Sequence, residues 1–210
     1  MILLELNNVV KRFGEKIVLD QFSLQIEDRK IYAITGRSGC GKSTLLNIIG
    51  GIEKATSGDV TILGNKNISP HSYKARKLLR NQISFLFQNY ALSDNDTVQY
   101  NLEMALTYNK VIKNRKQAIA TALNKVGMEG YEKQKIFTLS GGEQQRIAMA
   151  RLLLKPTKII LADEPTGNLD MKNRDAIFKL LLELNQEGKT VVIVTHDPEL
   201  AENCDVVISL

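Results

Sequence analysis

The stretch Gly36-Arg37-Ser38-Gly39-Cys40-Gly41-Lys42-Ser43-Thr44 fits the pattern of glycine, four residues, then glycine, lysine and serine or threonine. An apolar segment, 30–35, precedes it, and an apolar run without proline, 45–49, follows it. A strand, a glycine-rich loop and a helix in this order form a phosphate-binding loop, because glycine N–H groups turn toward an anion and the helix points its positive end there. In such a loop Lys42 reaches the outer phosphates of a nucleotide, and the Ser43 hydroxyl holds Mg²⁺. A plain glycine-rich turn with an exposed lysine would not need these flanking segments.

The composition is that of a globular protein with one large domain, since 43% of the 210 residues are hydrophobic and 24% are charged. Two cysteines, Cys40 and Cys204, make no disulfide framework. A disulfide at Cys40 would obstruct the phosphate loop, so we expect a reducing compartment. No apolar run reaches the roughly 18 residues that cross a bilayer, and the first residues do not resemble a signal peptide. We therefore expect a cytoplasmic protein.

The formal net charge is +5, and many basic residues fall in two loose groups, 74–80 and 110–116. Basic groups can mark nucleic acid or an anionic membrane surface, but most often they form a solvated face. No aromatic residues are interleaved here to stack on bases. We therefore expect no nucleic-acid partner.

The apolar pattern predicts an α/β fold with two kinds of sheet. Residues 22–27 alternate apolar and polar, and 58–65 read as a strand that runs into a turn; both pieces predict an antiparallel sheet beside the nucleotide. Near-continuous apolar strands separated by helices predict a mainly parallel sheet covered on both faces. These strands are 83–87, 158–162 and 190–194, with an amphipathic helix from Arg174 to Leu184 before the last.

Residues from about 90 to 155 predict a helical insert. One helix opens at Asp96-Thr97, and a second opens at Asn114 with Gly127 as its stop. We therefore expect a single domain, 1–210. Its α/β nucleotide-binding core covers about 1–88 and 156–210, and its helical subdomain covers about 89–155.

Two acids, Asp163 and Glu164, end the strand 158–162. Ligands of open α/β sheets bind at the carboxyl ends of the strands, so both acids should lie beside the phosphate loop. Side chains alternate along a strand, so one carboxylate can hold Mg²⁺ while its neighbour accepts a proton from water that attacks the γ-phosphate. A polar strand end before Pro165 is the plain alternative.

The stretch Leu139-Ser140-Gly141-Gly142-Glu143 predicts a second helix N-terminus. Ser140 and Glu143 have the spacing of a capping box, and the glycine N–H groups make a second possible anion site. One chain does not need two such sites for one triphosphate. Taken alone, the motif is also compatible with an ordinary capped helix.

With these motifs in this order, the sequence resembles the ATP-binding-cassette (ABC) ATPases over essentially its whole length. Residues 36–44 resemble the Walker A loop, 159–164 the Walker B motif and 139–143 the signature motif. The resemblance implies a P-loop NTPase (RecA-like) fold: a mainly parallel sheet core, an antiparallel β subdomain and a helical insert.

The resemblance also implies roles for individual residues. Gln88 matches the Q-loop glutamine that touches Mg²⁺ or the attacking water, His196 matches the switch histidine at the γ-phosphate, and 167–170 match the D-loop. Phe13 matches the aromatic residue that stacks on adenine, which is worth roughly 1–3 kcal/mol. The implied catalytic residues are Glu164, which deprotonates water, with His196, Gln88 and Lys42. The implied nucleotide contacts are Phe13, Gly36, Arg37, Ser38, Gly39, Cys40, Gly41, Lys42, Ser43, Thr44, Ser140, Gly141, Gly142 and Asp170, and the implied Mg²⁺ ligands are Ser43, Gln88 and Asp163.

ABC ATPases pair head to tail around two ATPs, and this pairing gives the second anion site a use. Each ATP then lies between Lys42 of one copy and 140–142 of the other, so the resemblance implies a homodimer with two equivalent sites. The sequence of residues 164–170 resembles that of the MacB/LolD/FtsE branch. The partners of this branch are FtsX-like membrane permeases, whose substrates include peptides, bacteriocins and lipoproteins. The resemblance thus implies an ATPase subunit at the inner face of the cell membrane, attached through a permease.

Alternative functions within the family are soluble ATPases. A cell-wall hydrolase regulator with an FtsX-like partner and a ribosome-associated protein are two of them, although the latter usually carries two cassettes. A DNA-repair or chromosome-organising type would need a long coiled coil between Gln88 and Ser140, where this chain has a short insert.

Overall fold

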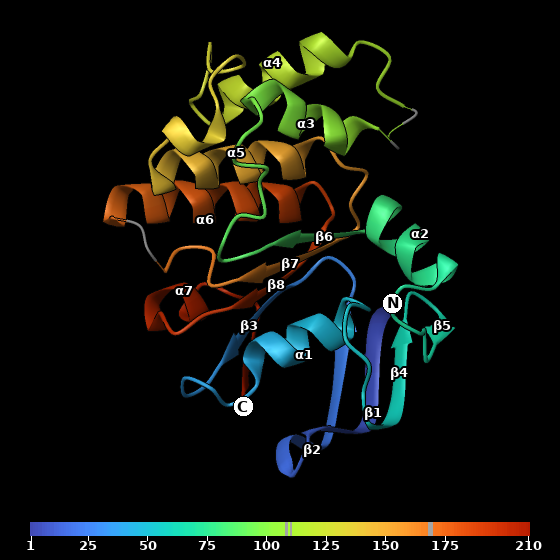
Figure 1. Cartoon of the computed structure of the whole chain (residues 1–210). Coiled ribbons are helices and arrows are strands. Elements are labelled where there is room, and N and C mark those ends of the chain that lie inside the picture. Colours follow the sequence, from blue (N-terminus) through green and yellow to red (C-terminus); the bar gives the residue numbers. More distant parts are fainter. Residues whose placement is uncertain (108, 110, 168–169) are drawn as a thin grey trace.

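A computed structural model describes the chain except for residues 108, 110, 168 and 169 (Figure 1). Its described residues form a five-stranded sheet with the order β6-β7-β8-β3-β9 and a four-stranded sheet with the order β2-β1-β4-β5. Helices α3, α4, α5 and α6 lie on one side of the five-stranded sheet, and α1 with the four-stranded sheet lies on the other (Figure 1). This arrangement confirms the predicted α/β fold.

The five-stranded sheet is parallel, as the apolar runs predicted. Its strands are β3 (Ile31–Thr35), β6 (Ile83–Leu86), β7 (Ile159–Asp163), β8 (Thr190–Val194) and β9 (Val206–Ser209). The strand β7 is an interior strand of this sheet, because it pairs with β6 on one side and β8 on the other. All residues of β8 are buried, which explains its unbroken apolar pattern.

Two hydrophobic cores lie on opposite faces of this sheet, because side chains alternate along each strand. Ile159 and Leu161 of β7 join the core that contains α1 (Lys42–Ile49). Ile160 and Ala162 join the core that contains the helical insert. Packing on both faces therefore fixes β7 and the acids at its carboxyl end.

The four-stranded sheet is antiparallel, as predicted, but two of its strands are long rather than short. They are β1 (Ile2–Phe13) and β2 (Lys16–Glu27), followed by β4 (Ser57–Ile62) and β5 (Asn65–Lys66). The pairing of β1 with β2 carries several register shifts, and Asn8 has a φ of +47°. These irregularities break the alternation of apolar residues, so the sequence suggests shorter pieces than the chain forms.

The insert between β6 and β7 is helical, with α3 (Val98–Leu106), α4 (Arg115–Lys125), a 3₁₀ turn (Ile136–Thr138) and α5 (Gly141–Leu153). The side chains of Thr97, Asn114 and Ser140 cap α3, α4 and α5, as the sequence predicted. The three α-helices contact one another. The subdomain boundaries remain predictions.

Three further helices differ from the predicted pattern. The helix α6 (Met171–Gln186) starts before the predicted Arg174, because Asp170 caps it by accepting from the Asn173 N–H at 2.8 Å. Two helices, α2 (Tyr73–Asn81) and α7 (Pro198–Glu202), were not singled out by the sequence. In the described part of the chain, every helix is too short or too polar to cross a bilayer.

Candidate functional site

The predicted phosphate loop connects β3 to α1. Gly41 has a φ of +110°, and a Cβ there would lie 2.6 Å from Val18 Cγ1, so the close approach of loop and sheet requires glycine. The Lys42 ammonium folds back and donates to the carbonyls of Gly36 at 2.9 Å and Arg37 at 3.0 Å. Lys42 is therefore held at the loop rather than extended into solvent.

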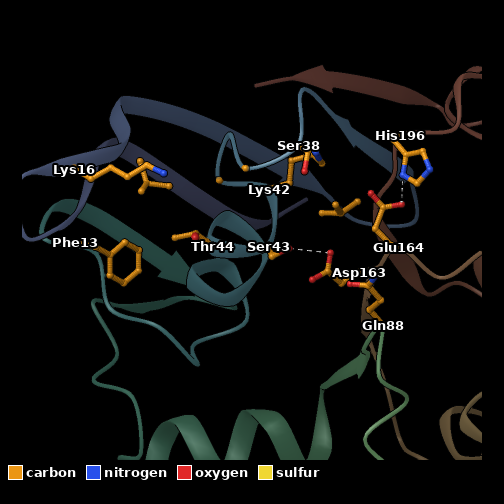
Figure 2. A pocket seen from close by; sticks show the side chains of 14 residues that line it. Phe13, Lys16, Ser38, Lys42, Ser43, Thr44, Gln88, Asp163, Glu164 and His196 are labelled. Carbon is orange, nitrogen blue, oxygen red and sulfur yellow. Dashed lines mark hydrogen bonds and ion pairs between the residues drawn. The ribbon is translucent and has the colours of Figure 1, made fainter. Parts of the chain in front are cut away.

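A cavity of about 550 Å³ opens beside this loop (Figure 2). Residues from both sheets and from the loop line it. They are Phe13, Lys16, Val18, Ser38, Gly39, Gly41, Lys42, Ser43, Thr44, Gln88, Asp163, Glu164, Val194 and His196. The carboxyl ends of β3, β7 and β8 thus meet at one site, as expected for a parallel sheet.

Asp163 and Ser43 form the oxygen-rich part of the cavity. The Ser43 hydroxyl donates to Asp163 Oδ1 at 3.1 Å (Figure 2). Burial raises the pKa of Asp163 above its ordinary value, while the Ser43 hydrogen bond acts in the opposite direction. Among the described residues there is no cluster of three or more His, Cys, Asp and Glu side chains that could hold a metal. Two hard oxygen donors still fit Mg²⁺, which commonly takes one or two protein ligands beside phosphate oxygens and water.

Glu164 and His196 form an ion pair or hydrogen bond at 2.9 Å between Oε2 and Nδ1 (Figure 2). Glu164 has a φ of +46°, a left-handed conformation that costs a non-glycine residue about 1–2 kcal/mol. Its N–H donates to the Val194 carbonyl at 2.9 Å, and its carbonyl accepts from the Gly167 N–H at 3.2 Å. These backbone bonds hold a strained residue whose carboxylate lines the cavity, an arrangement typical of functional sites.

Gln88 and Phe13 lie at different ends of the cavity (Figure 2). Gln88 follows β6 and lies near the two acids (Figure 2). Phe13 ends β1 and is 50% exposed, with the Lys11 ammonium 4.5 Å from the ring centroid. Lys11 is itself fixed by Glu53 at 2.6 Å, so one face of the ring is covered and the ring borders the cavity.

The structure brings part of the predicted site together and leaves part outside. Gly36, Arg37 and Cys40 belong to the loop but do not line the cavity. Asp170 caps α6 instead, and the D-loop residues Asn168 and Leu169 lie outside the described residues. The cavity is also lined by Lys16, Val18 and Val194, which belong to no motif. The only sequence signal for Lys16 and Val18 is that they lie close to Phe13 in the chain.

The predicted second anion site also lies outside this cavity. Ser140 and Gly141 are exposed at the start of α5. The capping box is present, since Glu143 Oε2 accepts from the Ser140 N–H at 2.8 Å and from its hydroxyl at 2.7 Å. The Ser140 hydroxyl bond lowers the pKa of Glu143 below its ordinary value. This glycine-rich N-terminus therefore does not line the cavity beside the chain's own phosphate loop.

Comparison with known proteins identifies the family. A family model described as "ABC transporter" matches residues 19–167. The chain belongs to the ABC transporter ATP-binding family. This ABC ATPase is 42% identical to the uncharacterized ABC transporter ATP-binding protein YvrO of Bacillus subtilis, over 97% of this chain and 91% of that protein. It is 40% identical to the macrolide export ATP-binding/permease protein MacB of Burkholderia pseudomallei, over 99% of this chain but only 33% of MacB.

A solved structure supports the same assignment. The dimeric post-hydrolysis state of the ATP-binding cassette MJ0796, bound to ADP and Pi, matches with a TM-score of 0.90 and 38% identity, over 99% of this chain and 94% of that one. The predicted P-loop NTPase fold of an ABC cassette is thus confirmed. As an ABC ATPase, the chain is the ATP-binding and ATP-hydrolysing subunit of a transporter, and the soluble alternatives are not favoured.

Proposed function

We propose that the cavity binds ATP with Mg²⁺ and that hydrolysis there drives a separate MacB-like membrane permease. One observation carries the catalytic part. A single cavity contains the loop lysine Lys42, the Ser43–Asp163 oxygen pair and the Glu164–His196 pair. This is the set of groups that phosphoryl transfer requires.

Substrate binding would use the full length of the cavity. Phe13 stacks on the adenine, and the loop from Gly36 to Thr44 surrounds the phosphates with backbone N–H groups and the Lys42 ammonium. Ser43 and Asp163, with Gln88 nearby, would hold Mg²⁺. When bound, this ion neutralises charge on the phosphate oxygens.

Catalysis would depend on Glu164. Its carboxylate accepts a proton from the attacking water, while His196 fixes the orientation of that carboxylate through the 2.9 Å contact. Gln88 orients the water, and Lys42 stabilises the charge that develops on the transferring phosphoryl group.

A second copy of the chain would complete each site. Ser140 and Gly141 are exposed and Gly142 is half-buried, none of the three lines the cavity of its own chain, and the similar MJ0796 cassette is dimeric. In a head-to-tail dimer these residues cap the γ-phosphate bound by the partner copy. The two-fold arrangement makes both sites equivalent.

A groove beside β6, the edge strand of the five-stranded sheet, is suited to the permease. It has a volume of about 410 Å³ and lies between α2, β6, α3 and α5. The stacked rings of Phe85 and Phe87, 4.9 Å apart, line it together with Met104 and Arg80. Similarity to the ATP-binding/permease protein MacB supports an FtsX/MacB-like partner. The proposed cargo class is a peptide, bacteriocin or lipoprotein, and the proposed location is the inner face of the membrane.

The Glu164→Gln variant tests the catalytic proposal. We expect the ATP turnover rate to fall by about 10²–10⁴-fold, because an amide cannot accept the proton, while ATP still binds and the dimer persists. Glu202→Gln, which changes an exposed carboxylate that does not line the cavity, is the matched control. Turnover by Glu164→Gln at the rate of this control would remove Glu164 from the role of base.

The groove assignment needs a separate test. Met104→Glu should abolish co-purification with a co-expressed MacB-like permease, because it places a charge in the apolar groove. Phe137→Glu, an exposed ring outside the groove, should not. Equal co-purification of both variants would exclude this groove as the docking surface.

A further inference from the structure

The short turn 87–91 separates the ATP cavity from the groove. Gln88 lines the ATP cavity, while Phe87 and Ala91 line the groove. The turn is closed by a hydrogen bond from the Tyr90 N–H to the Phe87 carbonyl at 2.9 Å. A movement of this backbone therefore displaces both walls at once.

The turn is held in an unusual conformation. Tyr90 and Ala91 have φ values of +60° and +48°, a left-handed region that disfavours residues with a Cβ. Two consecutive non-glycine residues stay in this region only where their surroundings hold them there. The sequence offers no glycine at either position.

One side chain supplies that hold. Arg151 of α5 donates through Nη2 to the Tyr90 carbonyl at 2.7 Å and through Nη1 to the Ala91 carbonyl. The planar guanidinium fork suits two adjacent carbonyls, whereas an ammonium has no such preset pair of donors. Burial lowers the pKa of Arg151 from its ordinary value. The Arg151 guanidinium therefore loses hydration and instead binds the carbonyls of the two residues with left-handed backbone.

The same turn contacts the other end of α5. A Cβ added to Gly141 would lie 3.4 Å from the Tyr90 hydroxyl, so that hydroxyl lies beside the signature motif. The turn thus meets α5 both at its exposed start and through Arg151 near its end.

Lys155, one turn further along the chain from Arg151, provides a natural comparison. It is also a partly buried cation whose ammonium donates to two carbonyls, those of Leu79 at 2.8 Å and Ile83 at 3.2 Å. These hydrogen bonds go to the end of α2 and the start of β6, not to the turn. The two cations therefore share their chemistry but hold different segments.

We propose that Arg151 is a positioning residue for ATP hydrolysis, which fixes the 87–91 turn so that Gln88 faces the nucleotide. This inference rests on the catalytic role proposed above for Gln88. It adds a residue that contacts neither ATP nor Mg²⁺ and acts only through the turn.

Steady-state ATPase kinetics of the whole chain test the proposal. Arg151→Met should lower kcat by about 10-fold or more, because small displacements of orienting groups are costly, and should leave the Kd for ATP unchanged. Lys155→Met should keep the wild-type kcat, and Arg151→Lys should give an intermediate value. Thermal unfolding of each variant reports whether it is folded; if Arg151→Met is not, Arg151→Lys serves in its place.

A double variant separates this role from a general structural one. If Arg151 acts through Gln88, Arg151→Met combined with Gln88→Ala should have the kcat of Gln88→Ala alone. Multiplied losses in the double variant, or an equal loss of kcat in Lys155→Met, would overturn the proposal. Neither result touches Glu164, so failure of the positioning role is distinguishable from failure of the catalytic assignment.

Discussion

Replacing Phe13 with alanine should weaken ATP binding without weakening the fold. The ring is 50% exposed, so its removal uncovers little core, and Lys11 stays anchored by Glu53 at 2.6 Å. One ring face is covered by the Lys11 ammonium, at 4.5 Å, and stacking on adenine uses the ring beside the cavity. Loss of a stack worth roughly 1–3 kcal/mol raises the Kd for ATP about 5- to 150-fold.

Isothermal titration calorimetry with ATP measures this change, and the chain provides a matched control. Phe137 is 60% exposed and has the Lys135 ammonium 5.8 Å from its ring centroid, but it does not line the cavity. Phe137→Ala should bind ATP as the wild type does, and Phe13→Tyr should keep most of the affinity. An unchanged Kd for Phe13→Ala would refute the adenine assignment, and the ring would then be a surface residue that only packs on Lys11.

Three further predictions concern the interface, the core and a buried cation. Ser140→Arg should leave ATP binding by a single copy intact but lower turnover by at least about 100-fold, since it blocks the partner's γ-phosphate; normal turnover at dimer-forming concentrations would argue against a shared site. Gly50→Ala would place a Cβ 2.1 Å from Phe85 Cζ. Such overpacking costs about 1–3 kcal/mol and should lower the Tm by about 2–12 °C in calorimetry, and an unchanged Tm would mean that the ring moves freely. Burial lowers the pKa of Lys155 from 10.5 to about 8, so the folded state binds fewer protons than the unfolded state between these pH values. The free energy of unfolding, measured with urea, should therefore rise with pH across that window by about 3 kcal/mol relative to that of Lys155→Met. A difference between the two proteins that does not change with pH would contradict the shift.

The sequence predicted the features that depend on local pattern. The loop at 36–44, the buried strands β7 and β8 and the caps at Thr97, Asn114 and Ser140 follow from residue type and spacing. These signals lie within a few residues of the element that they specify. The acids of β7 could be placed beside the loop because parallel strands end at one edge of the sheet.

Features that depend on contacts between distant residues were not predicted. Arg151 lies 60 and 61 residues from the two carbonyls that it binds, and a side chain bonded to backbone carbonyls leaves no residue-type signature at its partner. Lys16 and Val18 reach the cavity only because β2 pairs with a bulged β1. The positive φ of Glu164 could not be read from its residue type, which gives no indication of a left-handed backbone.

The exposed position of Ser140, outside the cavity of its own chain, has a consequence for how the protein behaves when dilute. If each nucleotide needs groups from two molecules, the rate per molecule falls as copies become scarce, and free subunits consume almost no ATP. A permease that binds two copies raises their local concentration far above that in the surrounding solution. Assembly on the membrane protein would then activate ATP hydrolysis, so that ATP is hydrolysed only where a permease is present to use the energy.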